Sequence, residues 1–236
     1  AEDGGYLMYY TEYDPNADGG EDDGTGIGVA GSEDGVSWET LGPPGVTPPF
    51  VLEGGEGEDL ETCFCLRREG EYYLYYSAYP QGGIEVYEGS GLAETMGSTI
   101  RLAVSSDGRS FTVIGDVISR DPGWYDEDAA FSPSVVETPS GLFMVYAGHR
   151  YDPALESGVY VLGAVSSDGI TWTKRSEPLL EPGMHLPQDD PASSYGWMRS
   201  GAAEPDVLLG PDGKWYLFFT GLDDTAGTRS IGLDRK

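Results

Sequence analysis

The sequence predicts an all-β protein built as a propeller of four-stranded antiparallel blades. Three observations lead to this prediction: a tight-turn motif occurs three times, an aromatic strand-like run occurs four times, and a further apolar run precedes three of those four. No segment shows the 3.6-residue apolar period of an amphipathic helix. Repeated short strands with one aromatic motif per unit are typical of propeller blades. A tandem of β-sandwiches is the alternative, but it would need more residues per unit, so we treat residues 1–236 as one domain.

The turn motif has the form Ser-x-Asp-Gly-x-Ser/Thr-aromatic and occupies residues 32–38, 105–111 and 166–172. Asp-Gly favours a tight hairpin turn, because Gly accepts a positive φ and the Asp side chain bonds the nearby backbone. A short predicted strand precedes each turn, and a shortened fourth copy of that strand closes the chain. These strands are Gly26–Gly31, Thr99–Val104, Val161–Val165 and Ser230–Asp234.

The aromatic runs end at positions that recur every 66 to 73 residues: Thr11, Ser77, Ala147 and Thr220. Their continuous apolar character predicts strands that are buried on both faces. The apolar runs before three of them are Leu60–Leu66, Phe131–Val136 and Ala203–Leu209. We therefore recognise four blades, of which the first lacks its first strand and the fourth its last. We expect the units to close into a wheel, and an incomplete five-bladed ring with a remnant blade in residues 181–203 stays open as an alternative.

The charge balance excludes several classes of partner. Thirteen Lys plus Arg stand against 41 Asp plus Glu, for a net charge of −28, so we expect neither nucleic acid nor an anionic membrane as partner. The apolar stretch 159–165 is too short to span a bilayer. Only three residues are Lys, which favours a halophilic or marine source, with ordinary acidic loops as the alternative. Because the chain starts at Ala1, a processed, trimmed or fragmentary chain is expected, and a secreted or periplasmic location.

Two stretches carry a resemblance to a known enzyme superfamily: the run from Tyr6 to Trp38 and the run from Phe131 to Trp172. They resemble the five-bladed-propeller glycoside hydrolases, which include arabinanases, β-xylosidases, invertases and levansucrases of families 43 and 32. The resemblance covers most of the chain. It implies a funnel at one end of a central channel, into which innermost strands bring a base or nucleophile, an auxiliary Asp and a general acid Glu.

The innermost strands of this sequence offer several acids for these roles. Glu204, followed by Pro205 and Asp206, is the best candidate for the general acid. Glu61 stands at the place that we consider equivalent two blades earlier, whereas Ser132 occupies a place where the resemblance implies Asp. Asp128, four residues before Ser132, is a candidate replacement. The sequence thus favours a glycoside hydrolase acting on a plant or algal pentose-type glycan, and the alternative is a non-catalytic carbohydrate-binding or interaction propeller.

Candidate sugar-binding residues lie shortly before innermost strands or after aromatic ones. Trp124 and Tyr125 precede one innermost strand, and Trp197 and Arg199 precede another. Aromatic faces beside polar groups suit sugar rings, although a plug between blades would use the same residues. The pair that follows Ala147 is a weaker candidate, since an ordinary loop would also explain it. This pair is His149 and Arg150.

The chain requires no cofactor for the predicted chemistry, and one loop is a candidate site for structural calcium or another cation. Asp14, Asn16 and Asp18 match the opening of a calcium loop, but Thr25 replaces the Glu that closes an EF-hand. A solvated acidic loop is the alternative. The two cysteines, Cys63 and Cys65, lie on one face of a predicted strand in a geometry that is poor for a disulfide, so we expect buried free thiols.

Overall fold

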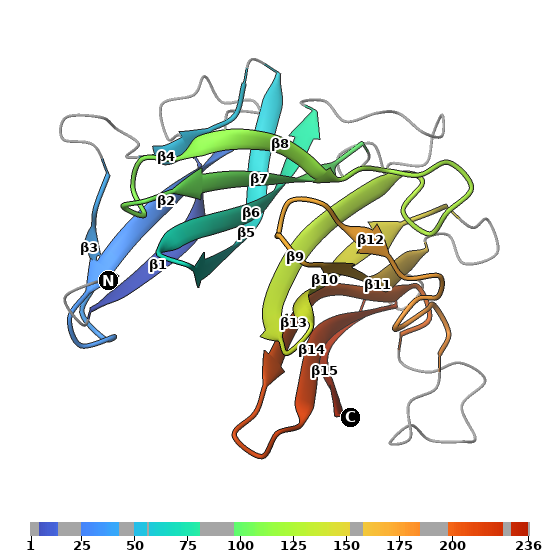
Figure 1. Cartoon of the computed structure of the whole chain (residues 1–236). Helices are drawn as coiled ribbons and strands as arrows, with labels where there is room; N and C mark the ends of the chain where they lie inside the picture. The colour runs from blue at the N-terminus through green and yellow to red at the C-terminus, as the bar shows by residue number, and fades with distance from the viewer. Residues whose placement is uncertain are drawn as a thin grey trace.

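The chain forms fifteen β-strands and no helix in the parts that the structure describes. This computed structural model describes residues 5–13, 25–42, 50–55, 57–80, 97–151, 158–184, 198–223 and 228–235. The strands fall into four antiparallel groups, which follow one another along the chain (Figure 1). The all-β prediction and the four predicted blades are therefore confirmed.

Blades two, three and four are meanders whose strands pair with their neighbours in sequence, whereas in blade one β3 and β4 both pair with β2. Blade one contains β1 (Tyr6–Tyr13), β2 (Thr25–Ser32), β3 (Glu39–Thr40) and β4 (Phe50–Glu53). Blade two contains β5 (Glu58–Arg68), β6 (Glu71–Pro80), β7 (Thr99–Ser105) and β8 (Thr112–Ile118). Blade three contains β9 (Ala129–Thr138), β10 (Gly141–His149), β11 (Val159–Ser166) and β12 (Thr173–Lys174). Blade four contains β13 (Gly201–Leu209), β14 (Trp215–Asp223) and β15 (Thr228–Arg235).

The hydrophobic core lies between successive blades. Ile27 of blade one packs with Leu74 of blade two, and Tyr75 of blade two packs with Met144 of blade three. Two further clusters join blades three and four. Strands β5, β9 and β13 contact one another in series and are the innermost strands. One parallel bridge, between Val159 and Gly201, also links blade three to blade four.

The blades form an arc, and blades one and four stand at its two ends (Figure 1). The expected closed wheel is not seen among the described residues, where blades one and four stand apart at the two ends of the arc (Figure 1). This difference explains a second one. The aromatic strands β6 and β10 are buried, as predicted, but Tyr6 and Met8 of β1 are 56% and 41% exposed, because only one face of blade one packs against another described blade.

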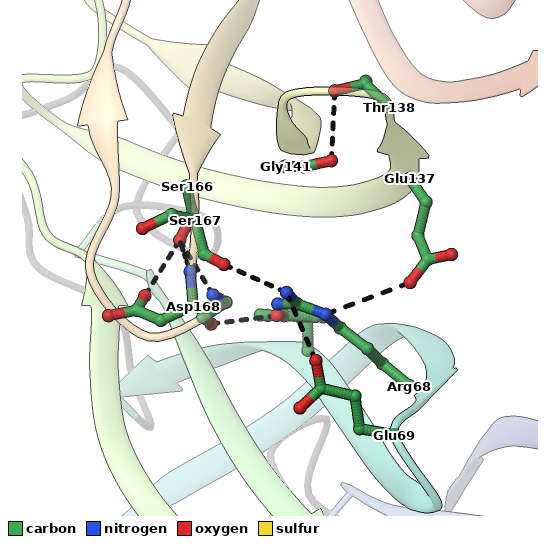
Figure 2. A network of polar contacts seen from close by, with 10 residues as sticks. Arg68, Glu69, Glu137, Thr138, Gly141, Ser166, Ser167 and Asp168 are labelled. Carbon is green, nitrogen blue, oxygen red and sulfur yellow. Dashed lines mark hydrogen bonds and ion pairs between the residues drawn. The ribbon is translucent and has the colours of Figure 1, made fainter.

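The tight-turn motifs lie at the opposite end of the blades from the starts of the innermost strands. Figure 2 shows this end between blades two and three, where Arg68 donates a hydrogen bond to the carbonyl oxygen of Ser167 at 3.1 Å. The same guanidinium lies 3.8 Å from the Glu69 carboxylate and 4.0 Å from that of Glu137. Arg68 thus ties the end of the β5–β6 hairpin to the turn of the next blade.

Candidate active site

The three innermost strands carry the same backbone irregularity at the same place. The strand register shifts between Glu61 and Cys63 in β5 and between Ala203 and Asp206 in β13. In blade three it shifts between Phe131 and Ser134 of β9, which pair with Ala147 and Val145 of β10. At each bulge one non-glycine residue has a left-handed backbone. These residues are Thr62 (φ 41°), Ser132 (φ 52°) and Glu204 (φ 50°). Such a conformation costs on the order of 1–3 kcal/mol, and both bulges and strained residues concentrate near active sites.

The pairing register corrects the sequence alignment of blade two by one residue. Glu61 pairs with Ser77, as Phe131 pairs with Ala147 and Ala203 with Thr220. Thr62 is therefore the equivalent of Glu204, and the equivalence assigned to Glu61 is wrong. The mismatch arises because Pro follows the left-handed residue in blades three and four, whereas Cys63 follows it in blade two, so the Glu was the only obvious marker for alignment.

A polar contact to the preceding blade supports two of the three bulges. The backbone N–H of Thr62 donates to the Thr11 hydroxyl at 3.2 Å, and the N–H of Ser132 donates to the Ser77 hydroxyl at 2.9 Å. The corresponding position in blade three is Ala147, which has no hydroxyl to offer blade four. The three bulges at Thr62, Ser132 and Glu204 are called the hub below. The hub repeats its backbone conformation from blade to blade but not its side chains.

Glu204 is the residue at the bulge of blade four, and its carboxylate is exposed. Its Oε2 accepts a hydrogen bond of 2.8 Å from the Thr220 hydroxyl on the neighbouring strand β14. Asp206 is exposed as well, and its Oδ1 accepts a 2.7 Å bond from Ser134 of β9. The carboxylate of Asp206 thus braces blade four against blade three, while Glu204 is held within its own blade and faces solvent.

Glu61 lies beside the bulge of blade two and is half-buried. Burial raises the pKa of its carboxyl, and the negative charge of Asp59 raises that pKa further. Both effects favour the protonated form, which suits a proton donor better than a base. Because Thr62 is next to Glu61 and is equivalent to Glu204, Glu61 and Glu204 lie at the same end of their blades.

Asp128 and His149 form a buried pair just before β9 and at the end of β10. Their side chains are each 5% exposed, and His149 Nδ1 lies 3.3 Å from Asp128 Oδ2. The backbone N–H of Tyr151 donates to the same oxygen at 2.7 Å. The interpretation of His149 as an ordinary loop residue is therefore wrong, since a buried carboxylate holds its ring in place at the last position of a strand.

The predicted rim residues have different surroundings. Tyr125 packs its ring 5.4 Å from Trp124 and 5.0 Å from Tyr160, and it adjoins the core between blades two and three. Arg150 is exposed, and Arg199 is partly buried just before β13. These contacts show that Tyr125 has a packing role, and they leave its sugar-binding role a prediction.

The acid that follows these aromatics, Asp126, is buried and paired, which the sequence reasoning did not foresee. The side chain of Asp126 is 0% exposed and lies 2.6 Å from Lys174 Nζ, and the Tyr146 hydroxyl donates to it at 2.9 Å. Burial raises the pKa of Asp126, against the opposing effect of the Lys174 charge. The available signal was Lys174 itself, one of only three Lys in so acidic a chain. This pair anchors the segment that carries Trp124 and Tyr125.

Four predicted site residues lie outside the described residues: Asp14, Asn16, Asp18 and Trp197. Within the described ranges, no group of three or more His, Cys, Asp and Glu side chains is placed to hold a metal ion. Cys63 and Cys65 are free and partly buried, and burial raises the pKa of each thiol to about 12. No described helix has the length and hydropathy of a membrane-spanning segment.

The fold and these strands match known carbohydrate-active proteins. Residues 64–228 match the family model for the N-terminal domain of glycosyl hydrolases family 32. The chain belongs to this family. Glu204, Asp206 and Asp128 lie inside the matched segment, and Glu61 precedes it. No curated protein matches the chain by sequence.

Solved structures of three glycoside hydrolase families are similar to this family 32 domain. A family 32 β-fructofuranosidase of Bombyx mori has 21% identity and a TM-score of 0.66, over 98% of this chain and 43% of that one. A family 117 enzyme of the marine bacterium Zobellia galactanivorans has 17% identity and a TM-score of 0.62, over 98% and 63%. A thermostable family 43 enzyme has 18% identity and a TM-score of 0.64, over 98% and 68%. At these identities the similarity supports the propeller fold, and the domain spans less than half of the Bombyx protein.

Proposed function

We propose that this family 32 domain is a glycoside hydrolase in which Glu204 is the general acid. The observation that carries the proposal is the place of Glu204: it is an exposed carboxylate at φ 50°, where the two other innermost strands hold Thr62 and Ser132. A fold retains a strained, solvent-facing acid only where the surrounding structure holds it there, and such residues cluster at active sites. In this role Glu204 donates a proton to the glycosidic oxygen as the bond between that oxygen and the anomeric carbon breaks.

The partner carboxylate is Glu61 or Asp128 in this proposal. Hydrolysis requires an ionised carboxylate that either activates water or attacks the anomeric carbon. Burial and Asp59 shift the pKa of Glu61 upward, which makes its ionised form less favourable, whereas the Asp128 carboxylate accepts a hydrogen bond from the Tyr151 N–H and lies 3.3 Å from His149 Nδ1. The position of the Asp128 carboxylate is thus fixed by two contacts, which suits a partner that must be held in place.

The proposed substrate is a plant or algal oligosaccharide or polysaccharide, bound beside Trp124, Tyr125 and Arg199. One supporting observation comes from a relative: the Bombyx β-fructofuranosidase has been solved, as a mutant, in complex with sucrose. A β-1,2-mannobiose phosphorylase from Listeria innocua, bound to its disaccharide, is also similar in fold. Carbohydrate is therefore the partner that we propose for this chain.

The decisive experiment is Glu204→Gln, assayed on a panel of aryl glycosides and polysaccharides at low and high salt. Loss of a general acid should lower kcat by about 100-fold to 10,000-fold, and the loss should shrink on aryl glycosides whose leaving group needs no proton. The matched control is Glu69→Gln. Glu69 is also a carboxylate with a left-handed backbone (φ 54°), but it lies in the β5–β6 hairpin with a side chain 79% exposed. Equal rates for the Glu204 variant and the wild type would refute the assignment.

The second candidate function is a non-catalytic carbohydrate-binding propeller. Ser132 favours it, because a buried hydroxyl stands where the resemblance implies a carboxylate. In that case the wild type shows no turnover on any member of the panel, while Glu204→Gln and the wild type bind the same glycan with equal affinity. Turnover by the wild type would exclude this candidate.

A further inference from the structure

The connection between blades two and three carries the two candidate sugar-binding aromatics, Trp124 and Tyr125. It runs over residues 119–128, from the end of β8 to the start of β9, and it contains neither strand nor helix. Local hydrogen bonds fold it: the N–H of Trp124 donates to the Asp121 carbonyl oxygen at 3.0 Å, and the N–H of Glu127 donates to the Trp124 carbonyl oxygen at 3.3 Å. These bonds stay within the connection, so its position against the blades depends on other contacts.

Lys174 of the outer strand β12 binds this connection at three points. Its Nζ donates to the Ser119 carbonyl oxygen at 2.6 Å, to Asp121 Oδ2 at 2.8 Å and to Asp126 Oδ2 at 2.6 Å. An ammonium group has three N–H bonds to donate, so the connection takes all of them. Lys174 therefore fixes the connection to blade three on both sides of the two aromatics.

The Asp126 carboxylate makes Lys174 important for the position of the connection. It is 0% exposed, its Oδ2 also accepts from the Tyr146 hydroxyl at 2.9 Å, and its Oδ1 has no hydrogen-bond partner among the described residues. A buried carboxylate is costly unless a cation pairs with it. Without Lys174 this carboxylate must take up a proton or move towards water, and in both cases the connection loses its attachment to β12.

The two aromatics are packed so that they move with Asp126. Tyr125 directly precedes Asp126, and its ring lies 5.4 Å from that of Trp124 and 5.0 Å from that of Tyr160. The backbone here lies directly on β10, since a Cβ added at Gly148 would lie 2.9 Å from the Tyr125 carbonyl oxygen and 3.0 Å from the Asp126 Cβ. At such close approach a shift of Asp126 displaces Tyr125 and the Trp124 ring that packs on it.

Asp128, the last residue of the connection, is held by contacts of its own. Its N–H donates to the His149 carbonyl oxygen at 3.0 Å, and its carbonyl oxygen accepts from the Gly97 N–H at 2.7 Å. Its carboxylate accepts from the Tyr151 N–H at 2.7 Å and lies 3.3 Å from His149 Nδ1. None of these partners belongs to β12 or to residues 119–127, so a movement of the aromatics leaves this carboxylate in place.

We propose that Lys174 is a positioning residue for sugar binding. It fixes Trp124 and Tyr125 where a sugar ring can stack on them, and it takes no part in the cleavage of the glycosidic bond. The inference rests on the proposed function, because it takes these two aromatics as part of the sugar-binding surface. Stacking depends on the place and the tilt of the ring, whereas the Asp128 carboxylate is held separately. Loss of Lys174 should therefore weaken substrate binding and spare the chemical step.

The first test is Lys174→Met, assayed with the aryl glycosides of the same panel. KM should rise about tenfold and kcat should stay within about twofold of the wild type, because a contact that acts equally on the ground state and the transition state changes KM alone. A merely structural role would lower the amount of folded enzyme, and hence the apparent kcat, without a change in KM. Thermal melting measures the folded fraction of each variant.

A milder pair of variants keeps the test valid if Lys174→Met does not fold. Asp121→Asn removes one charged partner of Lys174, and the Asp121 side chain is 58% exposed, so no buried charge is left unpaired. Its matched control is Asp116→Asn, since Asp116 lies 2.7 Å from Arg101 and is 38% exposed, but belongs to β8 and not to the connection. KM should rise about twofold to fivefold in Asp121→Asn and stay unchanged in Asp116→Asn.

Binding measured without turnover separates this proposal from the catalytic one. Arabinan, xylan and sucrose are titrated calorimetrically into Glu204→Gln and into the Glu204→Gln/Lys174→Met double variant, which should bind the same glycan about tenfold more weakly. If the wild type cleaves nothing, the role of Glu204 fails alone, and these affinities still decide the role of Lys174. Equal affinities, equal KM values for folded Lys174→Met and the wild type, or a fall in kcat at constant KM would overturn it, and so would a wild type that binds none of the three glycans.

Discussion

The hub and the turn end of the blades are both repeated structures, but they repeat different things. At the turn end, three copies share both the backbone and the side chains: the Asp carboxylates of 34, 107 and 168 accept from the same two backbone N–H groups at 2.8 and 2.7 Å. At the hub, three bulges share a left-handed backbone but hold Thr62, Ser132 and Glu204.

This difference separates stability from function. A turn that repeats its side chains uses each of them for local hydrogen bonds or for packing on the previous blade, so each copy needs the same residues. A bulge that repeats only its backbone presents different chemistry from each blade at one place. The acid at the hub is thus recognised by its departure from the repeat, and the turn is recognised by its agreement with it.

The largest expected effect compares Gly169, whose turn accepts a hydrogen bond from Tyr75 of the preceding blade, with Gly35, whose turn is exposed. Gly169→Ala should destabilise the fold by about 2–5 kcal/mol, because it adds a left-handed penalty of about 1–2 kcal/mol and places a Cβ 2.8 Å from Tyr75 Oη. Gly35→Ala should cost only the backbone penalty, since its nearest neighbour lies at 3.6 Å. Urea unfolding measures the change in the free energy of unfolding for both variants. Equal losses of stability would show that Tyr75 and its neighbours do not hold the Gly169 turn.

A smaller effect of opposite sign is expected at the hub. Ser132→Gly should stabilise the fold by about 1 kcal/mol, because glycine relieves the φ of 52° and removes a hydroxyl that is buried without a hydrogen-bond partner among the described residues. The N–H of residue 132 still donates to Ser77. The same unfolding assay applies, and a loss of stability would mean that the hub is not strained.

The smallest expected effect is a difference in pH dependence between the two ends. Backbone N–H groups lower the pKa of Asp34 and Asp168 to about 2, whereas burial and the charge of Asp59 raise the pKa of Glu61. A lowered pKa stabilises the fold above the unfolded value of about 4, and that contribution is lost as the pH falls through about 2. A raised pKa stabilises the fold at low pH and loses its contribution as the pH rises through the folded value.

Melting temperatures from pH 2 to pH 8 test this difference. The deficit of Asp168→Asn relative to the wild type should be full above pH 4 and shrink toward pH 2. Glu61→Gln should instead gain on the wild type as the pH rises above 4. Parallel curves for both variants and the wild type would contradict the two assignments.

Much of the fold could be predicted from local patterns. The Asp-Gly turns, the strands before them and the four aromatic strands are all set by residues close in sequence, so the repeat revealed the blades and their order. The start of the innermost strand β13 was also located from Glu204-Pro205-Asp206, and the catalytic role of Glu204 stays a prediction. Glu61 was misaligned by one residue, since a bulge changes the count of residues without leaving a mark in the sequence of blade two.

The site depended on contacts that no local pattern records. His149 faces Asp128 across 21 positions of sequence, Lys174 reaches Asp126 across 48, and Ser134 reaches Asp206 across 72. The three acids are among 41 Asp and Glu in the chain, so only the packing of strands and blades selects which of them meets each partner.

The sequence by itself determined the kind of unit, the number of blades that can be recognised and the rigid turn that repeats in three of them, because backbone propensity and short-range hydrogen bonds act within a few residues. The tertiary structure alone decided which side chains meet between blades. It decided which turn is covered by the preceding blade and which is exposed, and which acid is buried and which faces solvent. Those outcomes depend on the curvature of the arc, and curvature arises from the contact of whole blades.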